Sequence, residues 1–211
     1  GLPVDSLGSY FGSPYDGWTY NSGVETKELN KAMTIEDWYT ADLENNAVKW
    51  RITNNGILQN GIIRNSVTNN GTVKDVTATS YFTNNGTIES GVFSRYTNFG
   101  EQNPAVRWVT VNGGTVNGMT TAGVVGEQEV TITAPDGFKC WSVAGDTDFT
   151  LTEEQKHTNP LTLKLNGEDT GTIILTAQSE EGYYPLNLTD GKAYSVTADG
   201  AKAVSYTHLT L

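Results

Sequence analysis

The central part of this chain repeats itself every fifteen residues. The tripeptide Asn-Asn-Gly begins at Asn54, Asn69 and Asn84, and the residues around it recur in step. A period of fifteen is too short for a pair of helices and shows no 3.6-residue periodicity, so each repeat is expected to form one coil of a β-solenoid. Apolar residues recur two positions before each Asn, four after it and, for the most part, eight after it: Ile52, Val67, Phe82; Leu58, Val73, Ile88; and Ile62, Thr77, Val92.

Stacked coils place equivalent residues above one another, so these columns are expected to fill the interior. The Asn-Asn-Gly segments are expected to form corners, because Asn and Gly tolerate left-handed backbone at least cost. A looser corner is expected near Gly61 or Gly91, and the Asn columns are expected to hydrogen-bond along the stack, as amide ladders do. The alternative is a β-meander, in which each repeat forms a hairpin on one sheet.

The repeat fades on both sides. A degenerate copy surrounds Asn98, and residues 45–50 read as an incomplete first copy. A few coils need capped ends, and residues 1–45 are assigned to an N-terminal capping segment. Within it a short helix is expected at about 35–43, because Thr34 and Asp37 resemble a capping box and several apolar residues share one helical face. Strands are the alternative.

The capping segment is rich in aromatic residues. These are candidate ligand contacts, since exposed rings stack on sugars, but ordinary packing is the competing interpretation because aromatic side chains dominate core energetics. The candidate contacts are Trp18, Tyr20, Trp38 and Tyr39.

After Pro104 the sequence reads as a second β module of about 75 residues. Its motifs occur in a fixed order: "VTVNGGT" at 109–115, "GEQEVTITAP" at 126–135, "GFKCW" at 137–141 and "TIILTA" at 172–177. Over residues 105–179 this order resembles the divergent internalin B-repeat family, β-grasp-like modules strung along bacterial surface proteins. The resemblance implies a small β-grasp-like domain and brings no catalytic residues with it.

The Asn-Gly-Thr-rich repeats likewise resemble β-helical tracts of bacterial cell-surface adhesins. That resemblance implies an extracellular location, on the cell surface or secreted. Residues 180–203 read as the start of a further, truncated module. The last residues, 204–211, read as a non-native tail, with an ordinary final strand as the alternative.

Composition excludes several classes of function. The formal net charge of −11 leaves no basic face of the kind that nucleic-acid binding needs, and no apolar run reaches the length of a membrane helix. The single Cys140 cannot form an intrachain disulfide and is expected to be a small buried hydrophobe. No spacing suggests a zinc site. Asp146 and Asp148 lie two residues apart, as in some calcium loops, but that spacing is common by chance, so no metal or cofactor is expected.

No catalytic constellation stands out either. The two histidines, His157 and His208, lie in a polar turn and in the doubtful tail. The outward polar residues of the repeat are expected not to recur in phase, so no ladder of paired carboxylates is expected, and they are interpreted as a solvated face; they are Arg64, Lys74, Asp75, Glu89 and Arg95.

The sequence therefore predicts a mainly β protein, with a short β-solenoid at 46–104 followed by a small β-grasp-like domain. The expected function is non-enzymatic: a monomeric adhesin or stalk fragment that presents or binds a glycan or a host protein. The alternative is a carbohydrate-active enzyme or a carbohydrate-binding module on a β-helical scaffold. A cleft with two carboxylates would favour the enzyme, and exposed aromatic rings on one face would favour the binding module.

Overall fold

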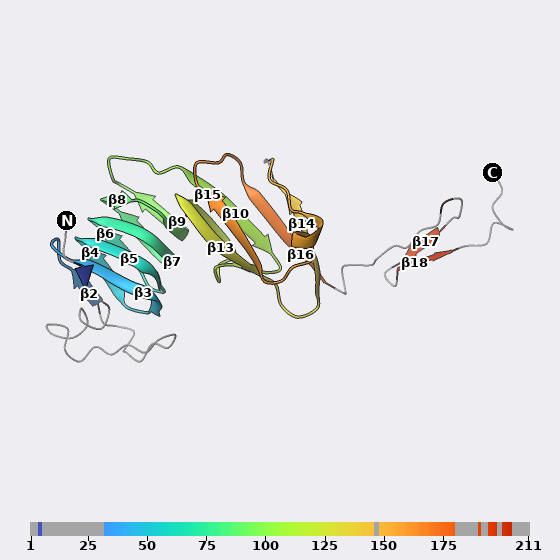
Figure 1. Cartoon of the computed structure of the whole chain (residues 1–211), viewed down its shortest axis with the longest axis horizontal. Coiled ribbons are helices and arrows are strands. Elements are labelled where there is room, and N and C mark those ends of the chain that lie inside the picture. Colours follow the sequence, from blue (N-terminus) through green and yellow to red (C-terminus); the bar gives the residue numbers. More distant parts are fainter. Residues whose placement is uncertain are drawn as a thin grey trace.

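The fold is seen in a computed structural model, which describes residues 4–5, 32–145, 148–179, 190, 194–197 and 200–203. The first half of the described chain is a β-solenoid of about four turns. Its strands stack in parallel, one coil over the next (Figure 1). They are β1 (Val4–Asp5), β2 (Ala32–Ile35), β3 (Thr40–Val48), β4 (Arg51–Asn54), β5 (Ile57–Ile63), β6 (Val67–Asn69), β7 (Thr72–Asn84), β8 (Thr87–Ile88) and β9 (Gly91–Asn98).

The fifteen-residue register is confirmed. Ile52 pairs with Val67 and Val67 with Phe82, all through parallel ladders. A meander would pair its strands antiparallel, so that alternative is wrong. The degenerate copy also forms a rung, because Asn84 pairs with Asn98 after a register shift that absorbs the missing residue.

Two of the three predicted interior columns are buried as expected, and the third is displaced by one residue. The inward column after the second corner is Val48, Ile63, Ala78 and Phe93, each fully buried. Ile62 and Thr77 point outward instead. The cause is a left-handed residue at this corner, Asn60 (φ 57°) or Asp75 (φ 51°). It breaks the in–out alternation of the strand, so the inward phase resumes one residue later than the repeat suggests.

The expected Asn ladder lies inside the solenoid. Asn54, Asn69 and Asn84 are buried, and each Nδ2 donates to the Oδ1 of the next Asn along the stack at 2.8 Å. Each amide also donates to a backbone carbonyl at its own corner, and those of Asn54 and Asn69 donate to one at the next corner as well; Asn54, for example, donates to Thr72 O at 2.9 Å. Buried amides are tolerated only when hydrogen-bonded, and the coil repeat supplies those partners automatically.

The glycine of each Asn-Asn-Gly corner is needed because there is no room for a side chain, and not because the backbone is left-handed. Among the described residues with positive φ, none belongs to these three corners, so the left-handed expectation is wrong there. A Cβ on Gly71 would overlap the carbonyl oxygen of Gly56, and a Cβ on Gly86 that of Gly71. The coils approach so closely at this corner that only glycine fits.

The helix expected at 35–43 is wrong. Residues 32–48 form a coil of the solenoid instead, since β2 pairs with β4 and β3 with β5. Met33 and Ile35 alternate inward with the period of a strand, and the turn between β2 and β3 closes with a hydrogen bond from Tyr39 N to Glu36 O (3.0 Å). Burial of Met33 and Ile35 against the neighbouring coil outweighs the local preference for a helix start at Thr34.

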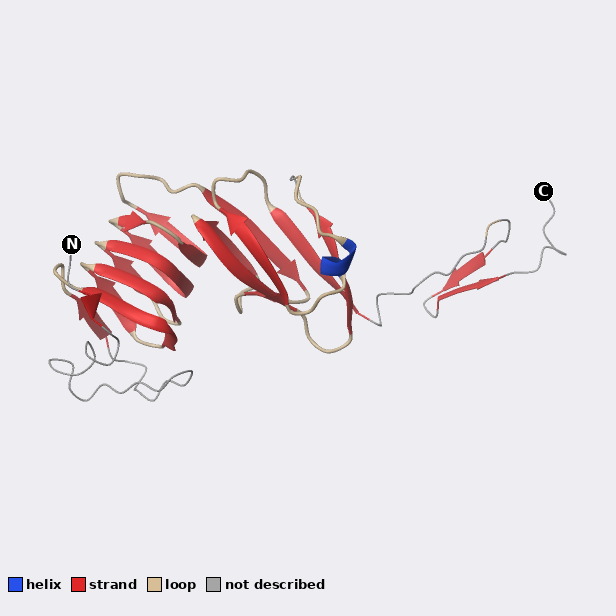
Figure 2. Ribbon diagram, in the orientation of Figure 1, coloured by secondary structure: helices blue, strands red, loops and turns tan. Residues whose placement is uncertain are grey.

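The second module has two β layers. One layer extends the solenoid sheet in the order β12–β10–β16–β14, and the other is the antiparallel sheet β11–β13–β15. A four-residue helix with a Thr152 capping box lies beside β14 (Figure 2). The elements are β10 (Val106–Asn112), β11 (Thr115–Val116), β12 (Thr121–Val125), β13 (Glu127–Thr133), β14 (Phe138–Ala144), α2 (Glu153–Lys156), β15 (Leu161–Asn166) and β16 (Ile173–Ser179).

The core of this module lies between its two layers. Trp141 is buried there and its Nε1 donates to Thr158 O at 2.8 Å. The β-grasp-like arrangement is not confirmed. A β-grasp fold packs a helix across one face of its sheet, whereas here a three-stranded sheet covers that face and the one described helix has four residues. Beyond it, β17 (Tyr194–Thr197) and β18 (Gly200–Ala203) pair as a separate antiparallel hairpin; residues 204–211 lie outside the described residues.

The module also closes the C-terminal end of the solenoid. β12 pairs antiparallel with β9, matching Gly123 with Phe93 and Val124 with Val92. Val92 points out of the last coil and is buried in the core of the module. The sheet therefore runs from solenoid to module at Gly91–Phe93, where β12 covers the edge of β9.

The buried Asn ladder gives the first prediction. Asn69→Ala removes the acceptor of Asn54 Nδ2 and the donor to Asn84 Oδ1 in a fully buried setting. The free energy of unfolding should fall by about 1–3 kcal/mol. Asn70→Ala, which affects the exposed outer ladder of the same corner, should change it by no more than about 0.5 kcal/mol. Urea unfolding measures both, and equal losses for the two variants would contradict a buried ladder.

Candidate binding face of the solenoid

One face of the solenoid presents a regular polar array, termed here the Thr–Asn face. It is formed by β2, β4, β6 and the last residues of β7 and β9. Inward Ile, Val and Phe leave the next residue of each strand pointing outward, and in every coil that residue is threonine. The Thr column is Thr34, Thr53, Thr68, Thr83 and Thr97, in continuous parallel register.

A second column runs beside it at the Asn-Asn-Gly corner. Asn70 Nδ2 donates to Asn55 Oδ1 at 2.8 Å, and Asn85 Nδ2 donates to Asn70 Oδ1 at 2.9 Å. These bonds hold the side chains in place while Asn70 and Asn85 remain exposed. Hydroxyls both donate and accept hydrogen bonds, and amides do the same with separate atoms. The face therefore repeats a mixed donor–acceptor pattern at the strand spacing of about 4.7–4.9 Å.

Exposed aromatic rings border this face. Within the described residues the large hydrophobic side chains that remain exposed are Trp38 (53%), Tyr81 (62%) and Phe99 (70%). Phe99 takes the place of the outer Asn in the last rung, because its N–H bonds to Asn84 O as the N–H of Asn85 bonds to Asn69 O. Trp38 lies in the corresponding corner of the first described coil. Tyr81 stands on the other border, with the Arg95 guanidinium 4.1 Å from its ring centre.

Two of the four aromatic residues predicted as ligand contacts can be placed. The rings of Trp38 and Tyr39 lie 4.7 Å apart at a tilt of 57°. Trp38 is exposed, whereas Tyr39 is half-buried and packs against the solenoid core. Trp18 and Tyr20 lie outside the described residues.

Sequence reasoning missed Tyr81 and Phe99. The repeat itself held the signal for both. Tyr81 directly precedes the inward Phe82, so alternation places it outside. Phe99 replaces Asn in the degenerate copy, where the column position predicts an exposed side chain.

The outer face next to the Thr–Asn face carries a few charged side chains, and some of them stack in columns. Lys74 and Glu89 are fifteen residues apart, and stacking brings them to 3.8 Å. The prediction that the polar residues share no phase is therefore wrong for this pair, although both side chains are exposed and such a pair contributes little to stability. Asp75 accepts hydrogen bonds from Ser90 Oγ and from Gln128 Nε2, both at 2.8 Å, the latter reaching across from the second module.

Two hollows in the described part of the second module bear on the question of an enzyme. One, of about 420 Å³, lies between β14 and α2 and is lined by Trp141, Phe149, Leu151 and Lys156 among others, without a carboxylate among its described lining residues. The other, of about 280 Å³, contains Asp148 and Asp169, and Arg107 lies 3.5 Å from the Asp169 carboxylate. That pairing indicates a structural ion pair.

Other chemistry is sparse in the part of the chain that the structure describes. No cluster of three His, Cys, Asp or Glu side chains could hold a metal ion there. Cys140 is half-buried rather than buried, and burial raises the pKa of its thiol despite the opposing charge of Lys156. Among the described helices, none is long and apolar enough to span a bilayer.

Comparison with known proteins does not assign the chain to a family. No protein-family model, no curated protein and no solved structure matches the chain. The resemblance to internalin B-repeats therefore stands on the quoted motifs alone.

Asp42, at the start of the charged outer column, gives a pH prediction. Burial would raise the pKa of its carboxyl, but hydrogen bonds from Glu44 N, Gln59 Nε2 and Asn60 Nδ2 outweigh burial and hold the pKa below its usual value. A lowered folded pKa stabilises the fold above the unfolded pKa of about 3.9, and this stabilisation is lost as pH falls through the folded pKa.

The wild type should therefore lose more unfolding free energy than Asp42→Asn between about pH 6 and pH 3. Urea unfolding across that pH range measures the difference. Asp136→Asn, at an exposed turn of the second module, serves as the control and should follow the wild type. Parallel curves for wild type and Asp42→Asn would contradict the assignment.

Proposed function

We propose that this chain is a non-enzymatic part of a bacterial adhesin, on the cell surface or secreted, and that its Thr–Asn face binds an extended polysaccharide. One observation carries the proposal. The exposed aromatic rings of the described residues, Trp38, Tyr81 and Phe99, all border the face that presents the Thr and outer Asn columns.

The chemistry of the face suits sugars. Sugar hydroxyls both donate and accept hydrogen bonds, as the Thr hydroxyls and Asn amides do. Aromatic rings provide apolar surfaces with a defined geometry, on which the C–H faces of pyranose rings stack. Trp38 and Phe99 stand at opposite ends of the outer Asn column, four rungs apart, or about 19 Å at the strand spacing. A ligand that contacts both must be several sugars long.

The shape of the face also favours a polymer. The face is an open sheet surface, whereas pockets for small molecules enclose most of their ligand. A polymer that lies along the stack meets the same group in each rung, and repeated weak contacts add to a useful avidity. The continuous sheet from β9 into β12 supports a second role. It would hold the binding face at a fixed angle on the next module, as a B-repeat-like spacer does in a stalk.

Retention of the whole chain on a panel of immobilised polysaccharides tests the proposal. The double variant Trp38→Ala/Phe99→Ala should bind about fivefold to tenfold more weakly, the equivalent of about 1–1.4 kcal/mol. The matched control, Lys74→Ala/Glu89→Ala, removes an exposed pair from the neighbouring face and should bind as the wild type does.

Three results would contradict the proposal. If no polysaccharide retains the chain, the proposal that it binds a glycan is wrong. If Trp38→Ala/Phe99→Ala and the control variant lose the same amount of binding, the Thr–Asn face is not the binding site. Release of new reducing ends from a bound polysaccharide would show that the chain is an enzyme.

A further inference from the structure

We infer that the polysaccharide is anionic and that a cationic corner beside the Thr–Asn face selects it. This inference rests on the proposed function and names the ligand class of the same face. The corner joins the third strand of each coil to the first strand of the next. It consists of residues 49–51, 64–66, 79–81 and 94–95, and is termed the basic corner.

Stacking gathers the cations of several coils at this corner. Val48 pairs with Ile63, so the residues that follow them, Lys49 and Arg64, lie on adjacent rungs. Arg51 precedes the buried Ile52 and Tyr81 precedes Phe82, and these two buried residues belong to one column. Tyr81 itself pairs with Arg95. Arg51, Tyr81 and Arg95 therefore form one outward column next to the Thr column.

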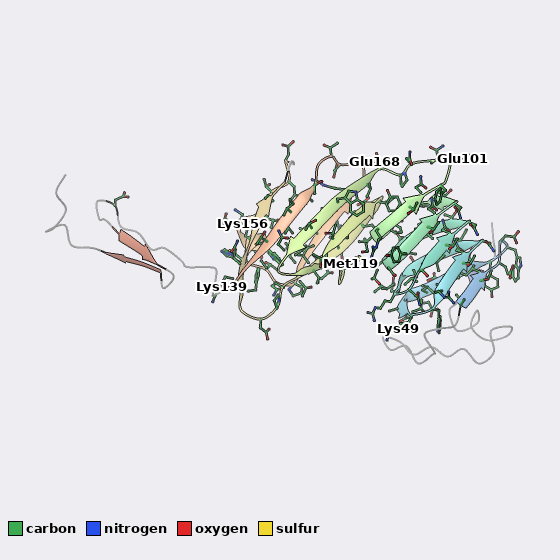
Figure 3. The ribbon with its side chains drawn as sticks, turned by 180° about the vertical axis from the view of Figure 1, so that it is seen from behind. Lys49, Glu101, Met119, Lys139, Lys156 and Glu168 are labelled. Carbon is green, nitrogen blue, oxygen red and sulfur yellow. The ribbon has the colours of Figure 1, made fainter. Side chains whose placement is uncertain are left out.

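The sign of the charge at this corner is opposite to that of the whole chain. The four segments of the basic corner hold Lys49, Arg51, Arg64 and Arg95 and contain no Asp or Glu, while the whole chain has 24 acidic and 13 basic residues. Figure 3 shows Lys49 and Glu101 at opposite edges of the solenoid, so the basic corner lies across the strands from Glu101 in the turn that follows β9. At physiological salt charges are screened beyond about 8 Å, so a ligand beside the exposed Arg51 and Arg95 meets these two local cations more than the net negative charge.

The geometry of Arg95 suits a fixed anion. Its guanidinium lies 4.1 Å from the centre of the Tyr81 ring, which orients the plane of the guanidinium and leaves N–H groups at its edge. An arginine fork donates two parallel hydrogen bonds to a sulfate or a carboxylate. Arg51 and Arg95 are both exposed and stand three rungs apart, about 14 Å at the strand spacing. That separation suits charges repeated along a polymer rather than one small ion.

Matched polymers with and without charge provide the test. The whole chain is applied to dextran sulfate and dextran, and to polygalacturonate and its methyl ester. We expect the charged member of at least one pair to retain the protein at least about tenfold more strongly, and that retention to weaken as NaCl rises from about 0.1 to 1 M, where screening shortens to about 3 Å. The pair that shows the preference identifies sulfate or carboxylate as the recognised group.

Variants then locate the cations responsible. Arg51→Gln/Arg95→Gln should lose about tenfold of the retention on the charged polymer and have a shallower salt dependence. Lys74→Gln/Lys164→Gln removes the same charge from exposed positions elsewhere and should behave as the wild type. Thermal unfolding confirms that both variants fold.

The failures of the two proposals differ. Equal retention on charged and neutral members, unchanged by the arginine variant, would overturn the anionic inference and leave polysaccharide binding in place. Equal loss in both double variants would overturn the basic corner as the selecting element. Retention on no polymer in this or the wider panel would overturn the proposed function together with the inference.

Discussion

The structure depends on the stacking of one coil on the next with equivalent side chains in contact. The buried Asn ladder shows what this constraint requires. Asn54, Asn69 and Asn84 carry amides into a core where an unpaired polar group is costly, and each is satisfied only because the next coil supplies the same amide at the same position. The glycines of the same corner add a steric condition, since any side chain there would strike the carbonyl of the coil before. Together the ladder and the glycines hold the coils in a fixed register.

The outer surface inherits this order. A strand that buries Ile52 or Val67 must turn its next residue outward, and threonine occupies that position throughout the face. The repeat thus turns a requirement of the core into a lattice of hydroxyls and amides on the surface. The residues that depart from the repeat, Trp38, Tyr81 and Phe99 among them, are the ones that give the lattice distinct borders. The residues that follow the repeat stabilise the fold, and those that depart from it make the borders of the face chemically different from its centre.

The sequence predicts the solenoid, its period and two interior columns, because these follow from local alternation and one repeat length. It misplaces the third column, since Asn60 and Asp75 adopt left-handed backbone that no residue count reveals. It also assigns a helix to 35–43, where burial of Met33 and Ile35 against the next coil decides for strands. The pairing of Val124 with Val92 joins segments more than thirty residues apart, and no local pattern announces such a contact. Of the candidate site, the sequence predicts Trp38 as a ligand contact, whereas Tyr81 and Phe99 are recognised only when the coils are superimposed.

The continuous sheet has a mechanical consequence. Hydrogen bonds between strands cross from one strand to the next, slanted in the parallel ladders of this solenoid and perpendicular at the antiparallel β9–β12 junction, so all of them run broadly along the direction in which the coils stack. Tension between the two ends of the molecule would load these bonds by peeling, one rung after another, rather than by sliding all of them at once. A chain that opens in this way yields gradually under tension and lengthens as it yields. In the proposed adhesive role, such peeling would dissipate a sudden pull while the coils not yet reached stay folded.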